Sequence, residues 1–361
     1  MRYACIEGVF ERNMKKKKIM TAAWMICIGL LAGCGGKTAD QNIAEGMEKI
    51  KRLDYGGALE SFEAARGAGE NERLLYRGMG LAYMGMTDYA QAIENFNTCL
   101  QLSNGMIQNV DFDVNYYLAA AYYKSGDAKS AEAAYTAILE LRGEETDAFF
   151  LRGTMRLALD EYEAAQEDFD RVLAQTNKNP DRLIAIYQAF DENGYRDIGR
   201  QYLENALAEN GERMNPYDKG RICYYLEDYQ QACNLLEEAK DAGTAESFLY
   251  LGRAYEATGD YNYAASVYNS YIAKDTSNAE IYNQLGLCLM RQGAYQQALE
   301  TFQKAMNIEN NGIMQTLQFN EIAAYEYLGD FQRAAVLMNN YIATYPDDTK
   351  AQREYEFLKT R

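Results

Sequence analysis

The chain of 361 residues has no histidine, only three prolines and a single tryptophan. Without imidazole, Ser-His and Cys-His nucleophile systems are excluded, and the commonest protein ligand for metals is missing. The carboxylates are numerous but scattered, so no paired acid and base stands out. We therefore expect a protein that is not an enzyme and that needs no cofactor or metal.

Positive charge is also in short supply, because 53 acidic residues face 36 basic ones and the formal net charge is −17. Residues 1–33 hold six of the basic residues and only two of the acidic ones, so the rest of the chain is more acidic still. Nucleic-acid binding depends on basic patches that neutralise phosphates. The composition therefore argues against a nucleic-acid partner.

Long apolar runs are absent as well, and the longest, from Ile19 to Gly33, has 15 residues. A membrane-spanning helix needs roughly 20. Four lysines, Lys15 to Lys18, precede the run, and small residues close it. This order of a basic segment, a short apolar segment and small residues is typical of a secretory signal peptide. An uncleaved signal anchor is the alternative.

The end of that run, Leu31-Ala32-Gly33-Cys34, resembles the lipobox of bacterial lipoproteins. The resemblance implies that a diacylglycerol is attached to the Cys34 thiol and that the leader is cleaved just before it. Residues 1–33 would then be an N-terminal extension and signal peptide, with Met14 as a possible true start, and residues 34–39 a lipidated tether. Two or three acyl chains hold a protein stably on a bilayer. We expect an extracytoplasmic lipoprotein on the cell membrane or outer membrane.

The remaining chain is built from one repeated phrase, an aromatic residue followed three positions later by a small one, as in TDYAQA and GDYNYA. The small landmark residues lie 34, 39, 34, 34, 33, 32, 34 and 36 residues apart. They are Ala58, Ala92, Ala131, Ala165, Gly199, Ala232, Ala264, Ala298 and Ala334.

A second small residue usually precedes each landmark by twelve positions, and a large residue, mostly aromatic, often follows it by four. With the period of about 34 residues, this pattern resembles tetratricopeptide repeats. The resemblance implies an all-α fold, a right-handed α-solenoid of about nine helix-turn-helix repeats over residues 40–346. Residues 347–361 would form a capping helix, since a terminal repeat needs a polar outer face. No linker interrupts the array, so we expect one domain.

Two places depart from the pattern. The third repeat arrives five residues late, which predicts an inserted loop around residues 102–111. Within it, Asp111-x-Asp113-x-Asn115 begins like a calcium loop but lacks the later glycine and glutamate, so we interpret it as a helix start. In the fifth repeat Tyr187 occupies the small position of the first helix, which predicts looser packing and a possible bend. Of the four cysteines beyond Cys34, Cys99 and Cys223 fall on repeat positions that normally face the core, and only Cys223 and Cys233 are a pairing worth testing.

In the tetratricopeptide family the first helix of each repeat lines a concave groove that binds peptides. The positions that usually point into this groove hold tyrosines with scattered arginines, a composition suited to anchoring a peptide. The predicted groove residues are Arg77, Tyr116, Tyr123, Phe150, Gln188, Tyr217, Arg221, Tyr224, Arg253 and Asn283.

The sequence thus predicts an interaction scaffold for peptide or protein partners in the cell envelope. The alternative is a lipoprotein that binds a glycan or small ligand on the same repeats, because tyrosines also stack on sugars. The terminal-carboxylate clamp of some family members needs lysine and asparagine on consecutive repeats, and the sequence does not show that set.

Overall fold

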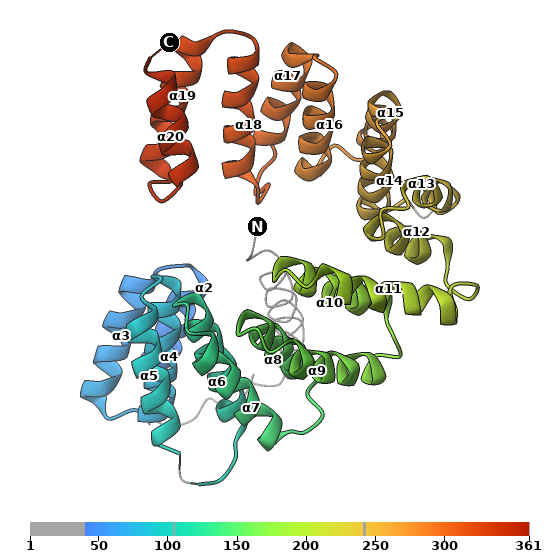
Figure 1. Cartoon of the computed structure of the whole chain (residues 1–361). Helices are drawn as coiled ribbons and strands as arrows, with labels where there is room; N and C mark the ends of the chain where they lie inside the picture. Colours follow the sequence, from blue (N-terminus) through green and yellow to red (C-terminus); the bar gives the residue numbers. More distant parts are fainter. Residues whose placement is uncertain (1–39, 104, 241–242, 361) are drawn as a thin grey trace, which may run out of the picture. The chain divides into compact units, whose positions relative to one another are not determined.

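The computed structural model describes residues 40–103, 105–240 and 243–360 (Figure 1). These residues form nineteen α-helices, and no strand occurs among them. The predicted leader, tether and Cys34 lie outside the described residues. The chain divides into two compact units, and the boundary in the sequence lies between Leu203 and Glu204, inside one helix. We describe each unit separately.

The N-terminal unit contains four complete helix pairs and the beginning of a fifth. Within each pair the second helix folds back on the first, and each pair packs on the next (Figure 1). The helices are α2 (Gln41–Lys51), α3 (Tyr55–Ala68), α4 (Glu72–Gly85), α5 (Tyr89–Gln101), α6 (Asn109–Lys124), α7 (Ala128–Leu141), α8 (Thr146–Ala158), α9 (Tyr162–Gln175), α10 (Pro180–Glu192) and α11 (Arg196–Asn210).

The C-terminal unit begins within α11 and contains four more pairs and a last single helix (Figure 1). These helices are α12 (Pro216–Tyr225), α13 (Tyr229–Glu238), α14 (Ala245–Ala257), α15 (Tyr261–Ile272), α16 (Ala279–Arg291), α17 (Tyr295–Met306), α18 (Met314–Tyr327), α19 (Phe331–Thr344) and α20 (Thr349–Leu358).

The small residues of the repeat pattern are where the helices touch. All eight landmark alanines are completely buried. In the eighth repeat a Cβ added to Gly286 of α16 would lie 2.3 Å from the ring of Phe302 in α17, so only glycine allows this ring to sit against the helix. The large residue four positions after the landmark therefore packs in the core between the paired helices. The nine helix pairs followed by α20 confirm the predicted α-solenoid.

Several turns between paired helices, such as the one between α14 and α15, are closed by a glycine and an aspartate. Gly259 ends the first helix with a φ of 85°, a left-handed conformation that suits glycine. The side chain of Asp260 then accepts a hydrogen bond from the backbone N–H of Tyr263 at 3.0 Å and caps the second helix. The same aspartate cap occurs at Asp88 and Asp330.

The fifth repeat is not loosely packed, and that expectation was wrong. The large Tyr187 of α10 is buried, with 4% of its surface exposed. A Cβ on Gly199 of α11 would lie 3.0 Å from the backbone oxygen of Tyr187 and 2.9 Å from Cβ of Phe190. The large residue on the first helix is thus offset by a glycine on the second, and the two helices approach closely.

The insertion before the third repeat is shorter than expected, because α6 already begins at Asn109. Asp111 accepts a hydrogen bond from the backbone N–H of Gln108 at 2.7 Å and also pairs with Arg73 of α4. Asn115 donates to the backbone oxygen of Asp111 at 2.8 Å. The calcium-like string is therefore a capped helix start, as interpreted from the sequence.

Candidate functional site

Within each unit, several first helices of neighbouring repeats lie against one another, and these faces are where a partner is expected. Contacts join α2 to α4, α4 to α6 and α8 to α10 in the N-terminal unit, and α12 to α14, α14 to α16 and α16 to α18 in the C-terminal unit. Polar side chains bridge several of these steps. The bridges are Arg77–Asp113 (3.2 Å), Asp147–Arg182 (2.5 Å), Arg221–Glu246 (3.7 Å), Arg253–Glu280 (2.9 Å) and Asn283–Asn320 (2.8 Å).

Four of the ten predicted groove residues belong to this ladder of bridges: Arg77, Arg221, Arg253 and Asn283. Sequence reasoning placed them on the correct helices but did not foresee that their polar groups are engaged within the chain. Because an exposed ion pair contributes at most about 1 kcal/mol, exposed members can exchange partners at little cost. Arg253 is half-buried, with 33% of its side chain exposed, and its partner Glu280 is 50% exposed.

A tyrosine–arginine cluster on α12 and α14 is the densest aromatic grouping of this face. It consists of Tyr217, Arg221, Tyr224, Tyr225 and Tyr250. The guanidinium of Arg221 lies 4.5 Å from the ring centre of Tyr217 and 5.8 Å from that of Tyr250. The hydroxyl groups of Tyr225 and Tyr250 are 3.1 Å apart and share a hydrogen bond.

Arg221 holds this cluster together from inside. It is 5% exposed, and it donates to Asp218 at 2.5 Å within its own helix. A cation between aromatic rings in a desolvated site contributes about 2 kcal/mol or more. Arg221 therefore positions the tyrosines, and the idea that it holds a partner directly is not supported by its burial.

Three tyrosines of the cluster, Tyr217, Tyr224 and Tyr225, stay neutral at physiological pH. Burial raises the pKa of Tyr224 and of Tyr225 above the ordinary tyrosine value. Burial also raises the pKa of Tyr217, despite the neighbouring Arg221 guanidinium. Neutral phenols donate hydrogen bonds to carbonyl or carboxylate oxygens and bury an apolar ring at the same time. Such groups suit the recognition of a peptide.

The other predicted residues divide into half-buried and buried. Tyr116, Tyr123 and Gln188 are half-buried on α6 and α10. Phe150 is only 1% exposed and packs on the ring of Phe169 at 5.7 Å between centres. The prediction that Phe150 lines the groove was wrong, because its side chain points into the core between α8 and α9. Asn283 is likewise 5% exposed and is engaged by Asn320.

Sequence reasoning missed the residues that complete the cluster. Tyr225 and Tyr250 lie off the groove positions usual in the family, so the repeat pattern gives them no role. Glu246 and Glu280, which meet Arg221 and Arg253, occupy the first turn of the next first helix. An acidic residue in the first turn of a first helix, 25 to 27 residues after an arginine of the preceding first helix, is the sequence signal that could have predicted these bridges.

The cysteines of the described residues are packing groups. Cys99, Cys223, Cys233 and Cys288 are all buried and free, so the pairing of Cys223 with Cys233 is not formed in this structure. Burial raises the pKa of Cys233 to about 11 and that of Cys288 to about 12. A thiol that stays protonated is a poor nucleophile and a poor metal ligand.

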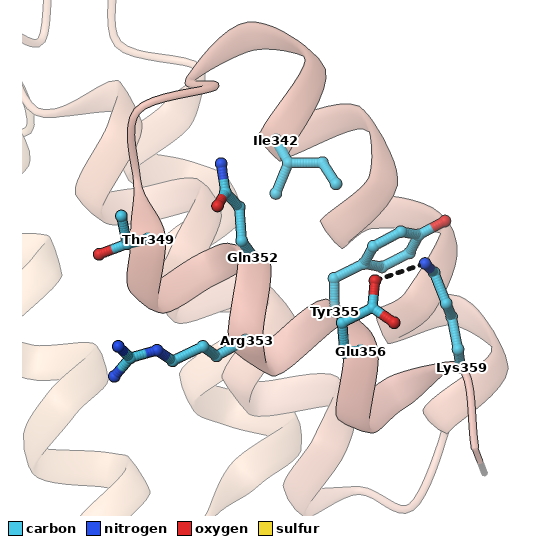
Figure 2. Close-up of a pocket in the computed structure, with 7 residues that line it drawn as sticks. All are labelled: Ile342, Thr349, Gln352, Arg353, Tyr355, Glu356 and Lys359. Atoms are coloured by element: carbon cyan, nitrogen blue, oxygen red, sulfur yellow. Dashed lines mark hydrogen bonds and ion pairs between the residues drawn. The ribbon is translucent and has the colours of Figure 1, made fainter.

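An open hollow of about 570 Å³ lies beside the last helix, between α19 and α20 (Figure 2). Its lining charges are partly neutralised within the chain, because Lys359 pairs with Glu356 at 2.6 Å and lies 4.3 Å from the ring of Tyr355. Tyr355 in turn donates to Asn339 at 2.8 Å. This hollow offers solvated side chains and no buried polar group aimed at a ligand.

Over the described residues, no group of three or more Cys, Asp and Glu side chains could hold a metal ion. In the same part of the chain, every helix is too short or too polar to cross a bilayer. The faces formed by the first helices are therefore the candidate site. Half-buried tyrosines and the ladder of bridges are the groups that a partner would contact there.

Family comparisons agree with this architecture. The family model described as tetratricopeptide repeat matches residues 76–105 and 116–180. The model described as the middle TPR-like domain of cilia and flagella-associated protein 70 matches residues 248–358. Together with the nine helix pairs, these matches define the class: an α-solenoid built from tetratricopeptide repeats.

Individual relatives are distant. A tetratricopeptide-repeat-containing protein of Methanocaldococcus jannaschii is 21% identical over 277 residues, which cover 75% of this chain and 43% of that protein. Tetratricopeptide repeat protein 8 of Homo sapiens is 28% identical over 129 residues, which cover 36% of this chain and 23% of that protein. This chain spans less than half the length of the curated relatives that it matches.

Solved structures were compared as well. A tetratricopeptide repeat protein from Parabacteroides merdae aligns with a TM-score of 0.47 at 18% identity, covering 78% of this chain and 98% of that chain. The crystal structure of MamA aligns with a TM-score of 0.38 at 20% identity, covering 46% of this chain and 95% of that chain. Repeats of this class support a protein-interaction role.

Proposed function

We propose that this chain is a non-catalytic scaffold that binds peptide or protein partners along its first helices. The observation that carries the proposal is the tyrosine–arginine cluster, where neutral tyrosines are held in place by the buried Arg221. Aromatic side chains preorganised in this way lose little conformational freedom when a partner docks. The absence of histidine and the protonated thiols leave no obvious nucleophile or base for catalysis in the described residues.

Within this proposal the chain acts on the extracytoplasmic face of a bacterial membrane, attached through a lipid on Cys34. The support is the lipobox-like Leu31-Ala32-Gly33-Cys34 after a basic and apolar leader. The acidic body would be repelled by anionic headgroups and would project from the membrane on residues 34–39. Partners would be other proteins of the cell envelope.

Lipid attachment is tested by replacing Cys34 with alanine in a bacterial host. We expect the wild-type chain to incorporate an alkyne-tagged palmitate and to sediment with membranes, and Cys34→Ala to lose both properties. Cys99→Ala, which changes a buried cysteine of the repeats, is the matched control and should keep both. Unchanged labelling and sedimentation of Cys34→Ala would refute the lipid anchor.

Partner binding is tested by photocrosslinking in the same host. A benzophenone amino acid at position 224 should capture a defined partner, and the same group at Val336, which is 59% exposed on the second helix α19, should not. Arg253→Gln should reduce that capture, since Arg253 is half-buried on α14 and its charge acts on Tyr224 and Tyr225 of the cluster. Equal capture from positions 224 and 336 would contradict a site on the first helices.

A further inference from the structure

A small cavity opens in the C-terminal unit where the first helix α18 packs between the second helices α17 and α19. It has a volume of about 190 Å³, several times the ~30 Å³ that one water molecule occupies. Helices α17, α18 and α19 enclose it. The lining residues are Met306, Gln318, Glu321, Ile322, Leu337, Asn340, Tyr341 and Thr344.

Two lining residues of the cavity, Gln318 and Glu321, have acceptor oxygens with unused hydrogen-bonding capacity. Oε1 of Gln318 is buried and has no hydrogen-bond partner in the described part of the chain. Oε1 of Glu321 accepts one hydrogen bond, from Nε2 of Gln303 at 2.9 Å, and no described lysine or arginine pairs with this carboxylate. A buried acceptor without a donor costs about 1–3 kcal/mol. The cavity therefore calls for a ligand with several N–H donors and positive charge.

The fourth repeat shows how the same place is filled elsewhere in this chain. Arg152 stands 13 residues before its landmark alanine, as Glu321 does, and Asp168 stands three residues after it, as Leu337 does. Nη2 and Nε of Arg152 donate to the two carboxylate oxygens of Asp168 at 2.7 and 3.0 Å. Nη1 of Arg152 also donates to Thr136 at 3.2 Å, and Thr136 is the counterpart of Gln303.

In the fourth repeat the groove between second helices is thus occupied by the chain's own guanidinium. In the ninth repeat the cation is replaced by Glu321 and its carboxylate partner by Leu337, which leaves a cavity with a carboxylate and a buried amide oxygen. We propose that this cavity binds the guanidinium of an arginine side chain from a basic partner segment. The flat fork of a guanidinium presents five N–H donors, which suits Glu321 and Gln318 together.

The net charge of the chain favours the same occupant. A protein of formal charge −17 attracts basic segments over long distances and raises their rate of encounter. Met306, Ile322 and Leu337 supply apolar contacts for the methylene stem of the arginine. This site uses none of the predicted groove residues and none of the tyrosine–arginine cluster, so either proposal can fail without the other.

The test uses two probes of equal shape, acetyl-arginine methylamide and acetyl-citrulline methylamide, which differ in the charged guanidinium. They are titrated into the full-length chain carrying ¹³C-methyl methionine, and the Met306 methyl signal is assigned with Met306→Leu. We expect a saturable shift of this signal with the arginine probe and about tenfold weaker binding with the citrulline probe. Equal affinities for both probes would overturn the proposal.

Variants separate the cavity from general charge attraction. Glu321→Gln should weaken binding of the arginine probe about tenfold, whereas Glu309→Gln, at an exposed acid outside the cavity, should leave it unchanged. The double variant Glu321→Arg/Leu337→Asp installs the ion pair of the fourth repeat and should abolish binding while the helical circular dichroism is kept. Retained binding in that double variant, or equal effects of the two single variants, would refute the site.

Discussion

Asp168 is the residue whose loss should destabilise the repeat array most through electrostatics. Its carboxylate is 2% exposed and receives two hydrogen bonds from Arg152 and one from Nη1 of Arg156, the latter at 2.9 Å. Arg156 also meets Glu132 of the preceding repeat at 3.3 Å. Helices α7, α8 and α9 are therefore tied together through one buried anion.

The magnitude follows from what remains after Asp168 is changed to leucine. Two arginines, 15% and 18% exposed, then lack their main counter-charge. Removing one partner of a buried ion pair costs about 3–5 kcal/mol, because the other charge stays buried and unpaired. Glu132 still neutralises part of the charge of Arg156, so we expect about 3 kcal/mol for Asp168→Leu.

Removing both partners should cost less than the sum of the single changes. In Arg152→Leu/Asp168→Leu only Arg156 has lost a partner, and it keeps Glu132, while apolar replacements of buried ion pairs are often nearly neutral. We expect a coupling energy of about 1.5 kcal/mol or more in the double-mutant cycle. Leu337 in the ninth repeat shows that leucine is accommodated at the position of Asp168.

The cycle is measured by urea unfolding followed by far-ultraviolet circular dichroism, with hydrogen exchange of the α8 and α9 peptides to locate the change. Hydrogen exchange is needed because repeat arrays unfold in segments and one midpoint can hide a local effect. Glu163→Gln, at an exposed acid of α9, is the control and should change stability by less than about 0.5 kcal/mol. Additive effects of the two single variants would refute the reasoning.

Three further predictions concern packing, backbone and pH. Gly286→Ala should destabilise by about 2–3 kcal/mol in urea unfolding, because its methyl group would overlap the ring of Phe302. Changing Leu53, which has a φ of 62°, to glycine should raise the free energy of unfolding by about 1 kcal/mol, measured as a higher urea midpoint. Burial and the carboxyl of Glu354 raise the pKa of Glu326 to about 7, so the folded state binds the extra proton. Hydrogen-exchange protection of α20 should therefore be greatest below about pH 4.5 and fall as pH rises through 7, and Glu326→Gln should remove this dependence.

The sequence predicted the parts of the fold that depend on the repeat. A buried alanine, a glycine under an aromatic ring and an aspartate cap each leave a fixed spacing in the chain, so their contacts could be foreseen. Phe150 shows the limit of that method. A family position says which helix face a residue occupies, but whether an aromatic side chain lies on the groove or turns into the core depends on its neighbours, here Phe169.

The ladder of bridges between first helices and the cavity beside α18 could not be predicted from the sequence for a related reason. The landmark residues are nearly identical in every repeat, so they fix the spacing of the helices and leave equivalent grooves between them. What fills a groove is decided by residues outside the pattern, such as Arg152 with Asp168 in one repeat and Glu321 with Leu337 in another. Those residues contribute little to the periodic signal. The repeat pattern therefore predicts the arrangement of the helices, and the differences between repeats indicate where partners can bind.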